Sequence, residues 1–201
     1  MPAKEKFPIT RLDQSIRVAD GVRALYTPDP SSRLLAETVI DLTKMLGGSV
    51  GWALFGALAV GIYSRPRGTD EIEIVLTANA DIPLAIAATS RRFKQIGSHA
   101  IEHRHTGITV RLVTPELFHV DPIIFAMAIR SAIRRKLSTV EVPVVSREGF
   151  VAVSLCRVEH YDLAHIATVA RSGGPVDLSG YPLTGRQKDA YLKVLREAGS
   201  A

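Results

Sequence analysis

The chain has 201 residues, 46% of them hydrophobic and 22% charged, with a formal net charge of +5. This composition supports a folded domain with a substantial core and excludes extensive disorder. The single cysteine, Cys156, excludes an intramolecular disulfide and a metal site built from cysteines. The mildly basic charge is compatible with an acidic partner such as a nucleotide or a nucleic acid, and equally with an ordinary soluble surface.

The N-terminus shows no secretory signal, and we expect a cytoplasmic protein. The longest uncharged run, residues 47–64, is rich in glycine and leads directly into an acidic stretch. A buried strand and turn account for this run better than a membrane-spanning helix does. We therefore expect no membrane segment.

The first part of the chain predicts alternating helices and strands. Asp29 and Pro30 are typical of a helix start, and Gly47 and Gly48 of a helix end. Apolar residues between these points recur at helical spacing. The expected elements are an extended arm over residues 1–28, helices over 30–46 and 57–63, and strands over 49–55 and 70–77.

The rest of the chain continues this alternation and ends in helices. Thr106 and Gly107 predict a hairpin turn, and Asp121 with Pro122 predicts a further helix start. Basic residues at the ends of two of the helices would complement the helix dipole. We expect helices over 82–96, 122–136, 147–158, 162–171 and 184–198, with strands over 101–104, 108–114 and 140–145. The expected organisation is an N-terminal arm (1–28), an α/β domain with a mixed sheet flanked by helices (29–146) and a helical tail (147–201).

The acidic strand carries the sharpest functional signal. Alternate side chains of a strand share a face, so Glu71 and Glu73 point one way while Ile72 and Ile74 pack on the other side. Neighbouring carboxylates repel each other unless a cation or a shared proton separates them. A small-residue turn and a basic turn precede this strand, which indicates a site for phosphate and a divalent metal ion. The alternative is an exposed strand face, solvated or paired with arginines.

This stretch resembles the nucleotidyltransferase superfamily. Gly56-Ala57 matches the glycine turn of that family, and Glu71-Ile72-Glu73 matches its pair of carboxylates separated by an apolar residue. The turn over residues 65–70 looks like the basic, threonine-ended turn of bacterial members, including those related to abortive-infection toxins. Residues 146–166 look like the helical tail of those proteins, and the resemblance covers roughly residues 30–170.

The resemblance implies metal-dependent transfer of a nucleotidyl group from a nucleoside triphosphate to an acceptor that the sequence does not identify. Glu71 and Glu73 would be the catalytic carboxylates and would bind Mg²⁺, which stabilises the attacking and leaving oxygens. Backbone N–H groups of the glycine turn would approach the phosphates. The expected nucleotide-binding residues are Gly56, Ala57, Arg67, Thr69 and Arg111.

Four departures from the family pattern define a degenerate motif and leave a second function open. Glu71 stands where the family usually has Asp, and Ala57 lacks a hydroxyl that could contact phosphate. Arg111 replaces a third carboxylate, and Ser154 stands where a lysine is frequent. The alternative is a catalytically inactive descendant that acts as a nucleotide-binding or protein-interaction module. A basic nucleic-acid-binding protein is a third, weaker reading.

The remaining reactive residues carry structural interpretations. His103 and His105 would share one face of a hairpin, but without a third ligand nearby we interpret them as solvated hairpin residues. Cys156 has no adjacent base that would make it a nucleophile, and we expect a small buried residue.

Overall fold

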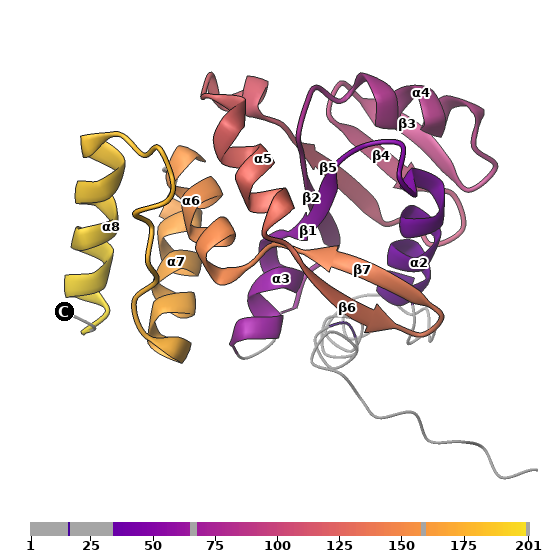
Figure 1. Cartoon of the computed structure of the whole chain (residues 1–201). Coiled ribbons are helices and arrows are strands. Elements are labelled where there is room, and N and C mark those ends of the chain that lie inside the picture. Colours follow the sequence, from indigo (N-terminus) through magenta and orange to yellow (C-terminus); the bar gives the residue numbers. More distant parts are fainter. Residues whose placement is uncertain (1–15, 17–33, 65–67, 158–159, 200–201) are drawn as a thin grey trace, which may run out of the picture.

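A mixed sheet of seven strands forms the centre of the molecule. The computed structural model describes residues 16, 34–64, 68–157 and 160–199. The strand order is β3-β4-β5-β2-β1-β7-β6, with parallel and antiparallel neighbours (Figure 1). The strands are β1 (Trp52–Phe55), β2 (Glu71–Leu76), β3 (Phe93–Gly97), β4 (Ala100–His103), β5 (Thr109–Val113), β6 (Ile133–Leu137) and β7 (Val140–Val144).

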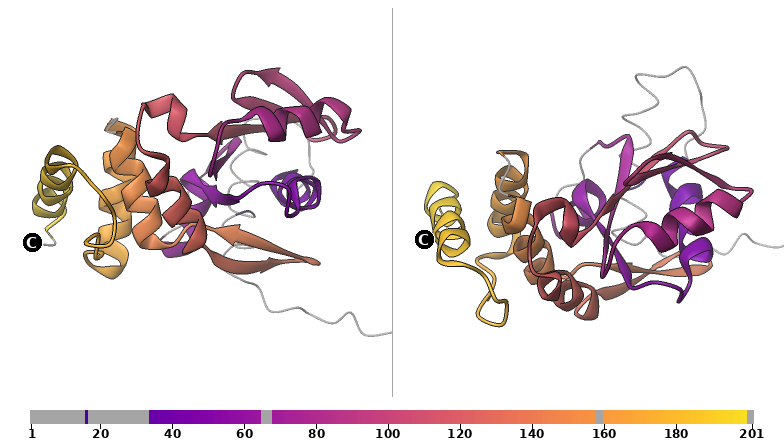
Figure 2. Two further views of the ribbon diagram at one scale, coloured as in Figure 1. Left: turned by 45° about the horizontal axis from the view of Figure 1, so that its top comes forward. Right: turned by 90° about the horizontal axis from the view of Figure 1, so that it is seen from above.

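Helices surround this sheet and extend beyond it. They are α2 (Leu34–Leu46), α3 (Gly56–Tyr63), α4 (Asp81–Thr89), α5 (Pro122–Arg130), α6 (Arg147–Arg157), α7 (His160–Gly173) and α8 (Gly185–Glu197), with a 3-10 turn η1 (Pro115–Phe118). The three C-terminal helices lie side by side at one end of the molecule, and α4 with β3 and β4 lies at the other (Figures 1 and 2). The expected α/β architecture with a helical tail is confirmed.

The register of the central strands assigns side chains to the two faces of the sheet. Glu73 of β2 pairs with Phe55 of antiparallel β1 and with Arg111 of parallel β5. Directly paired residues point to the same face. Ile72 and its paired neighbour Val110 therefore belong to the opposite face, and both are fully buried. The expected alternation along β2 is confirmed.

The expected helix over residues 82–96 is wrong in its second half. The helix ends at Thr89, because the Ser90 hydroxyl accepts hydrogen bonds from the backbone N–H groups of Arg92 (3.1 Å) and Phe93 (3.2 Å) and turns the chain. The following residues form β3, which pairs with β4. The basic residues after Ser90 thus lie in a turn and a strand and do not compensate a helix dipole.

The expected helix over residues 122–136 is also too long. It begins as expected, since the Asp121 carboxylate accepts from the backbone N–H of Ile123 at 2.9 Å, but it ends at Arg130. Residues 133–137 form β6, an edge strand that pairs with β7 in antiparallel register. The triplet Arg134-Arg135-Lys136 lies exposed on this edge strand. Charged side chains on an edge strand discourage pairing with another chain.

The tail helices agree closely with the sequence. Thr184 and Gln187 form a reciprocal capping box at the start of α8. Gly174, at φ +77°, adopts the left-handed conformation just past the end of α7. Buried residues of the tail and of the sheet belong to one hydrophobic cluster, which also includes Ile16. The division at residue 146 stays a prediction, and none of the described helices is long and apolar enough to cross a bilayer.

Arg147 connects the first two tail helices. From the start of α6, its guanidinium donates to the carbonyls of Val169 (3.2 Å), Gly173 (3.0 Å) and Gly174 (2.6 Å). These carbonyls lie at and just past the end of α7, where the last carbonyls of a helix lack intrahelical donors. One charged side chain therefore satisfies the C-terminus of the neighbouring helix.

We expect Arg147→Met to destabilise the protein by about 1.5–3 kcal/mol, because charge-assisted hydrogen bonds to α7 are lost. The measurement is the free energy of unfolding from denaturant titration. Arg171→Met, at an exposed position on α7, is the control and should cost less than about 0.5 kcal/mol. Equal losses in the two variants would contradict this role of Arg147.

Candidate functional site

The glycine turn brings the backbone of one strand against the carboxylate of the next. Gly56 follows β1 directly and adopts φ +63°, in the left-handed region that favours glycine. A Cβ atom on Gly56 would lie 2.1 Å from Oε2 of Glu73, so only glycine fits there. The Glu73 carboxylate thus contacts the first residue of α3, where the helix dipole favours negative charge.

Glu73 is buried and paired with an arginine from the helical tail. Its Oε1 accepts from Nη1 of Arg157 at 2.8 Å, and the two side chains are 5% and 8% exposed. The guanidinium lies near the rings of Phe55 (5.9 Å) and Phe118 (5.7 Å), which shield the pair from water. The charge of Glu73 is therefore balanced by a cation of the protein itself.

Glu71 has its own arginine at a more exposed position. Nη2 of Arg111 lies 3.0 Å from Oε2 of Glu71, and the side chains are 51% and 33% exposed. The Thr69 hydroxyl donates to the backbone carbonyl of Glu71 at 2.9 Å, which shapes the start of β2. The structure thus brings Glu71 and Arg111 together, as the sequence suggested, but assigns Glu73 to a different arginine.

The other expected binding residues lie around these two pairs. Gly56 is buried and Ala57 is partly exposed at the start of α3, while Thr69 is partly exposed at the start of β2. Arg67 lies outside the described residues. The nucleotide-binding roles of all these residues stay predictions.

The two pairs do not fit a magnesium site of the expected kind. Mg²⁺ requires near-octahedral oxygen ligands and is held by free carboxylates together with substrate phosphates. Here Arg157 occupies one carboxylate, and Arg111 occupies the other from the position of the expected third carboxylate. A metal ion would have to displace a buried guanidinium, which would then be left without its anion.

Sequence reasoning missed Arg157 because it lies 84 residues after Glu73 and in a different type of element. The sequence offers one indirect signal, the neutral Ser154 at a position where the resemblance leads one to expect a lysine. Ser154 lies one turn before Arg157 on α6 and is fully buried. Within the described part of the chain, its hydroxyl has no hydrogen-bond partner.

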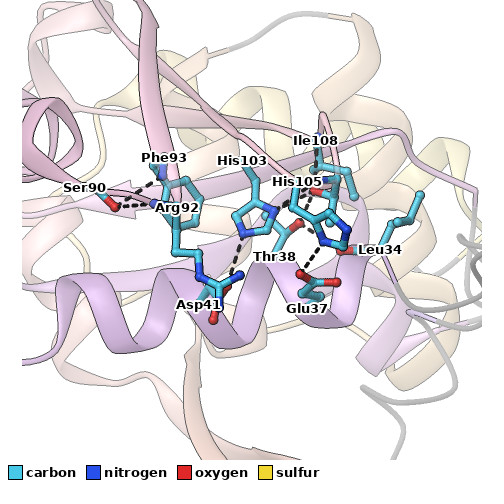
Figure 3. Close-up of polar contacts among 11 residues, drawn as sticks. Leu34, Glu37, Thr38, Asp41, Ser90, Arg92, Phe93, His103, His105 and Ile108 are labelled. Atoms are coloured by element: carbon cyan, nitrogen blue, oxygen red, sulfur yellow. Dashed lines mark hydrogen bonds and ion pairs between the residues drawn. The ribbon is translucent and has the colours of Figure 1, made fainter.

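A second polar cluster lies between α2 and the end of β4 (Figure 3). Glu37 and Asp41 of α2 approach His103 of β4, and one ligand atom of each lies within 4.8 Å of the others. The expectation of a solvated His103 is wrong, because α2 and the β4–β5 turn bury it completely. His105 agrees better with that expectation, since its side chain is 68% exposed.

Cys156 lies beside Arg157, but its thiol is unreactive. Burial raises the pKa of its thiol from 9.0 to about 11, although a hydrogen bond from the Gln187 amide to Sγ (3.6 Å) opposes this shift. Only the thiolate is nucleophilic. Cys156 is partly exposed and not fully buried as expected, but the raised pKa agrees with a thiol that is not a nucleophile.

Comparisons with known proteins support the fold. No family model matches the chain, and no curated protein matches it. Among solved structures, the chain is similar to an antigenic nucleotidyltransferase-like protein from Paracoccidioides brasiliensis, with a TM-score of 0.58 and 17% sequence identity. The match covers 83% of this chain and 89% of that protein. The chain therefore has a nucleotidyltransferase-like fold, as the sequence motifs indicated.

We expect Arg157→Met to destabilise the protein by about 3–5 kcal/mol, because it leaves the Glu73 carboxylate buried without a cation. The double variant Glu73→Leu/Arg157→Met should recover most of this loss. Arg111→Met breaks an exposed pair and should cost less than about 1 kcal/mol. Denaturant unfolding measures all three. A double variant no more stable than Arg157→Met would refute this description of the pair.

We expect Cys156 in the native protein to react with a thiol reagent at pH 8 about a hundredfold more slowly than in the denatured chain. The raised pKa lowers the thiolate fraction by about that factor. Absorbance of the released thiol product follows both reactions. Equal rates in native and denatured protein would contradict the buried environment.

Proposed function

We propose that the chain uses the nucleotidyltransferase fold to bind a nucleoside triphosphate without catalysing metal-dependent nucleotidyl transfer. The observation that carries this proposal is the buried ion pair between Glu73 and Arg157. Transfer in this fold requires paired carboxylates that hold metal ions at the reacting phosphate. In this chain both carboxylates are paired with arginines.

Nucleotide binding is supported by the cation that lies at the surface. Arg111 is half-exposed, and surface ion pairs such as that with Glu71 contribute little energy. Its guanidinium can therefore exchange a carboxylate for a phosphate, which it binds in the same bidentate geometry. Gly56, Ala57, Thr69 and Arg67 are the proposed companions of Arg111 in contacting the phosphates.

Active nucleotidyl transfer remains the competing function. It is favoured by one observation: Glu71 and Glu73 alternate along β2 and point to the same face of the sheet. In that case Arg157 has to leave Glu73 before Mg²⁺ binds. The acceptor would then be a separate molecule, whose chemistry these residues do not specify.

We expect a nucleoside triphosphate to raise the melting temperature equally in EDTA and in Mg²⁺, because arginines replace the metal as phosphate ligands. ATP, GTP, CTP and UTP are tested separately by thermal shift, and the best ligand is then titrated by calorimetry. Arg111→Ala should weaken binding by about tenfold or more, since a charge-assisted hydrogen bond is lost. Arg134→Ala, on the exposed edge strand β6, should leave affinity unchanged.

Two results would overturn the proposal in different ways. If none of the four triphosphates shifts the melting temperature, nucleotide binding is wrong and the fold serves another partner. If pyrophosphate release from a triphosphate depends on Mg²⁺ and disappears in Glu73→Gln, the chain is an active transferase.

A further inference from the structure

Carboxylate and imidazole ligands meet on the face of the sheet away from Glu71. Glu102 of β4 pairs with Thr109, which in turn pairs with Glu71, so these three residues share one face. His103 follows Glu102 and points to the other face, toward α2. The cluster around His103 is therefore separated from the β2 carboxylates by the sheet itself.

Three ligands of this cluster are held in place by their elements. Glu37 and Asp41 are four residues apart on α2 and share one side of the helix. His103 is 0% exposed, and its ring packs edge-on against Phe93 with centroids 4.9 Å apart. Its Nε2 lies 3.2 Å from Oδ2 of Asp41. Two carboxylates from one helix and a buried imidazole thus lie close together without any rearrangement of the backbone.

The other side of the imidazole has the support that a metal-bound histidine needs. Nδ1 of His103 lies 2.9 Å from the Thr106 hydroxyl, which lies 2.7 Å from the Thr38 hydroxyl. Thr38 in turn donates to the carbonyl of Leu34 at 2.8 Å (Figure 3). A cation on Nε2 requires a proton on Nδ1, and Nδ1–H then donates a hydrogen bond to the Thr106 hydroxyl. Thr106 donates in turn to Thr38, whose hydroxyl donates to the Leu34 carbonyl.

The same groups also satisfy the imidazole without a metal ion. The backbone N–H of Thr106 lies 3.2 Å from Nδ1 and donates to it when Nδ1 carries no proton. Nε2–H then donates to the Asp41 carboxylate. Both arrangements are therefore compatible with a buried His103.

A second histidine lies beside Glu37, and a surface hollow lies beside Asp41. Nδ1 of His105 lies 2.7 Å from Oε1 of Glu37, and this imidazole is exposed. A hollow of about 470 Å³ opens beside Asp41 and gives access from solvent. Arg92 lies at its edge, with Nε 3.5 Å from Oδ2 of Asp41, and its side chain is 62% exposed. The long side chain of Arg92 can rotate outward into solvent when a cation binds to Asp41.

We propose that Glu37, Asp41 and His103 bind a divalent transition metal ion of the Zn²⁺ type, with His105 as the fourth ligand. Nitrogen and oxygen ligands in this combination suit Zn²⁺, whereas Mg²⁺ prefers oxygen alone. Ligand atoms of a tetrahedral zinc site lie about 3.4 Å apart, against up to 4.8 Å here. The partly exposed side chain of Glu37 closes this difference by a rotamer change.

Calorimetric titration of the full chain with Zn²⁺ tests the site. We expect one equivalent to bind, with affinity lowered at least a hundredfold in Asp41→Asn and His103→Gln. Thr106→Val keeps the shape of the side chain but removes the acceptor for Nδ1–H, and it should cost about 10–100-fold. Co²⁺ in place of Zn²⁺ should give the visible absorption of a four-coordinate site, and this absorption should disappear in Asp41→Asn.

Two controls separate this site from other metal binding. His99→Gln removes a partly exposed histidine whose ring contacts the Ser98 hydroxyl, and Glu71→Gln alters the opposite face of the sheet; both should leave Zn²⁺ affinity unchanged. Binding that survives Asp41→Asn, or its absence in the wild-type chain, would overturn the proposal. Circular dichroism verifies that each variant is folded. If His103→Gln does not fold, the Zn²⁺ affinity of Asp41→Asn alone tests the site.

Discussion

The buried carboxylate of Glu73 is the constraint on which the arrangement of the sheet and the helical tail depends. An ionised carboxylate removed from water is costly unless a cation and hydrogen-bond donors compensate it. Arg157 supplies that cation from the last residue of α6, between the rings of Phe55 and Phe118. The position of α6 is therefore tied to β2 by charge as well as by apolar packing.

The same constraint explains the glycine that precedes α3. In the resemblance to nucleotidyltransferases, Gly56 lets the backbone approach a phosphate. In this chain the space that a Cβ would fill is taken by Glu73. A negative group thus lies at the start of α3, as a phosphate would, but it belongs to the protein. One glycine supports both arrangements, and its presence alone does not distinguish a binding site from a structural contact.

The sequence predicted the parts of the fold that depend on local patterns. Gly56, the alternation of Glu71 with Ile72 and the cap at Asp121 are short-range signals, and each agrees with the structure. The two predicted helices that were too long had wrong C-terminal ends, because the local signal that ends each helix is easy to overlook. Ser90 and Ser131 end α4 and α5, while the apolar residues that follow belong to strands. Helical and strand periods are hard to separate over so few residues.

The partners of the charged residues could not be predicted in the same way. Arg111 was expected near the carboxylates because it takes the place of the third carboxylate in the resemblance, and the parallel pairing of β2 with β5 confirms that it lies beside them. Arg157 and the Asp41–His103 contact depend instead on how helices pack against the sheet, and spacing along the chain carries no information about that packing. His103 was expected to be solvated because the sequence shows no third ligand nearby, whereas α2 covers it in the structure.

The carboxylates on the two faces of the sheet have different partners, and this difference determines which face is better suited to bind a metal ion. On the β2 face each carboxylate has a guanidinium within 3.0 Å, and guanidinium groups cannot release their protons at physiological pH. On the α2 face the partly buried carboxylate of Asp41 contacts the imidazole of His103 as well as the largely exposed Arg92, and an imidazole nitrogen can bind a cation. The face that sequence motifs mark as a metal site is therefore the one less suited to bind metal. The other face presents a buried imidazole beside two carboxylates, a combination that the motifs did not predict.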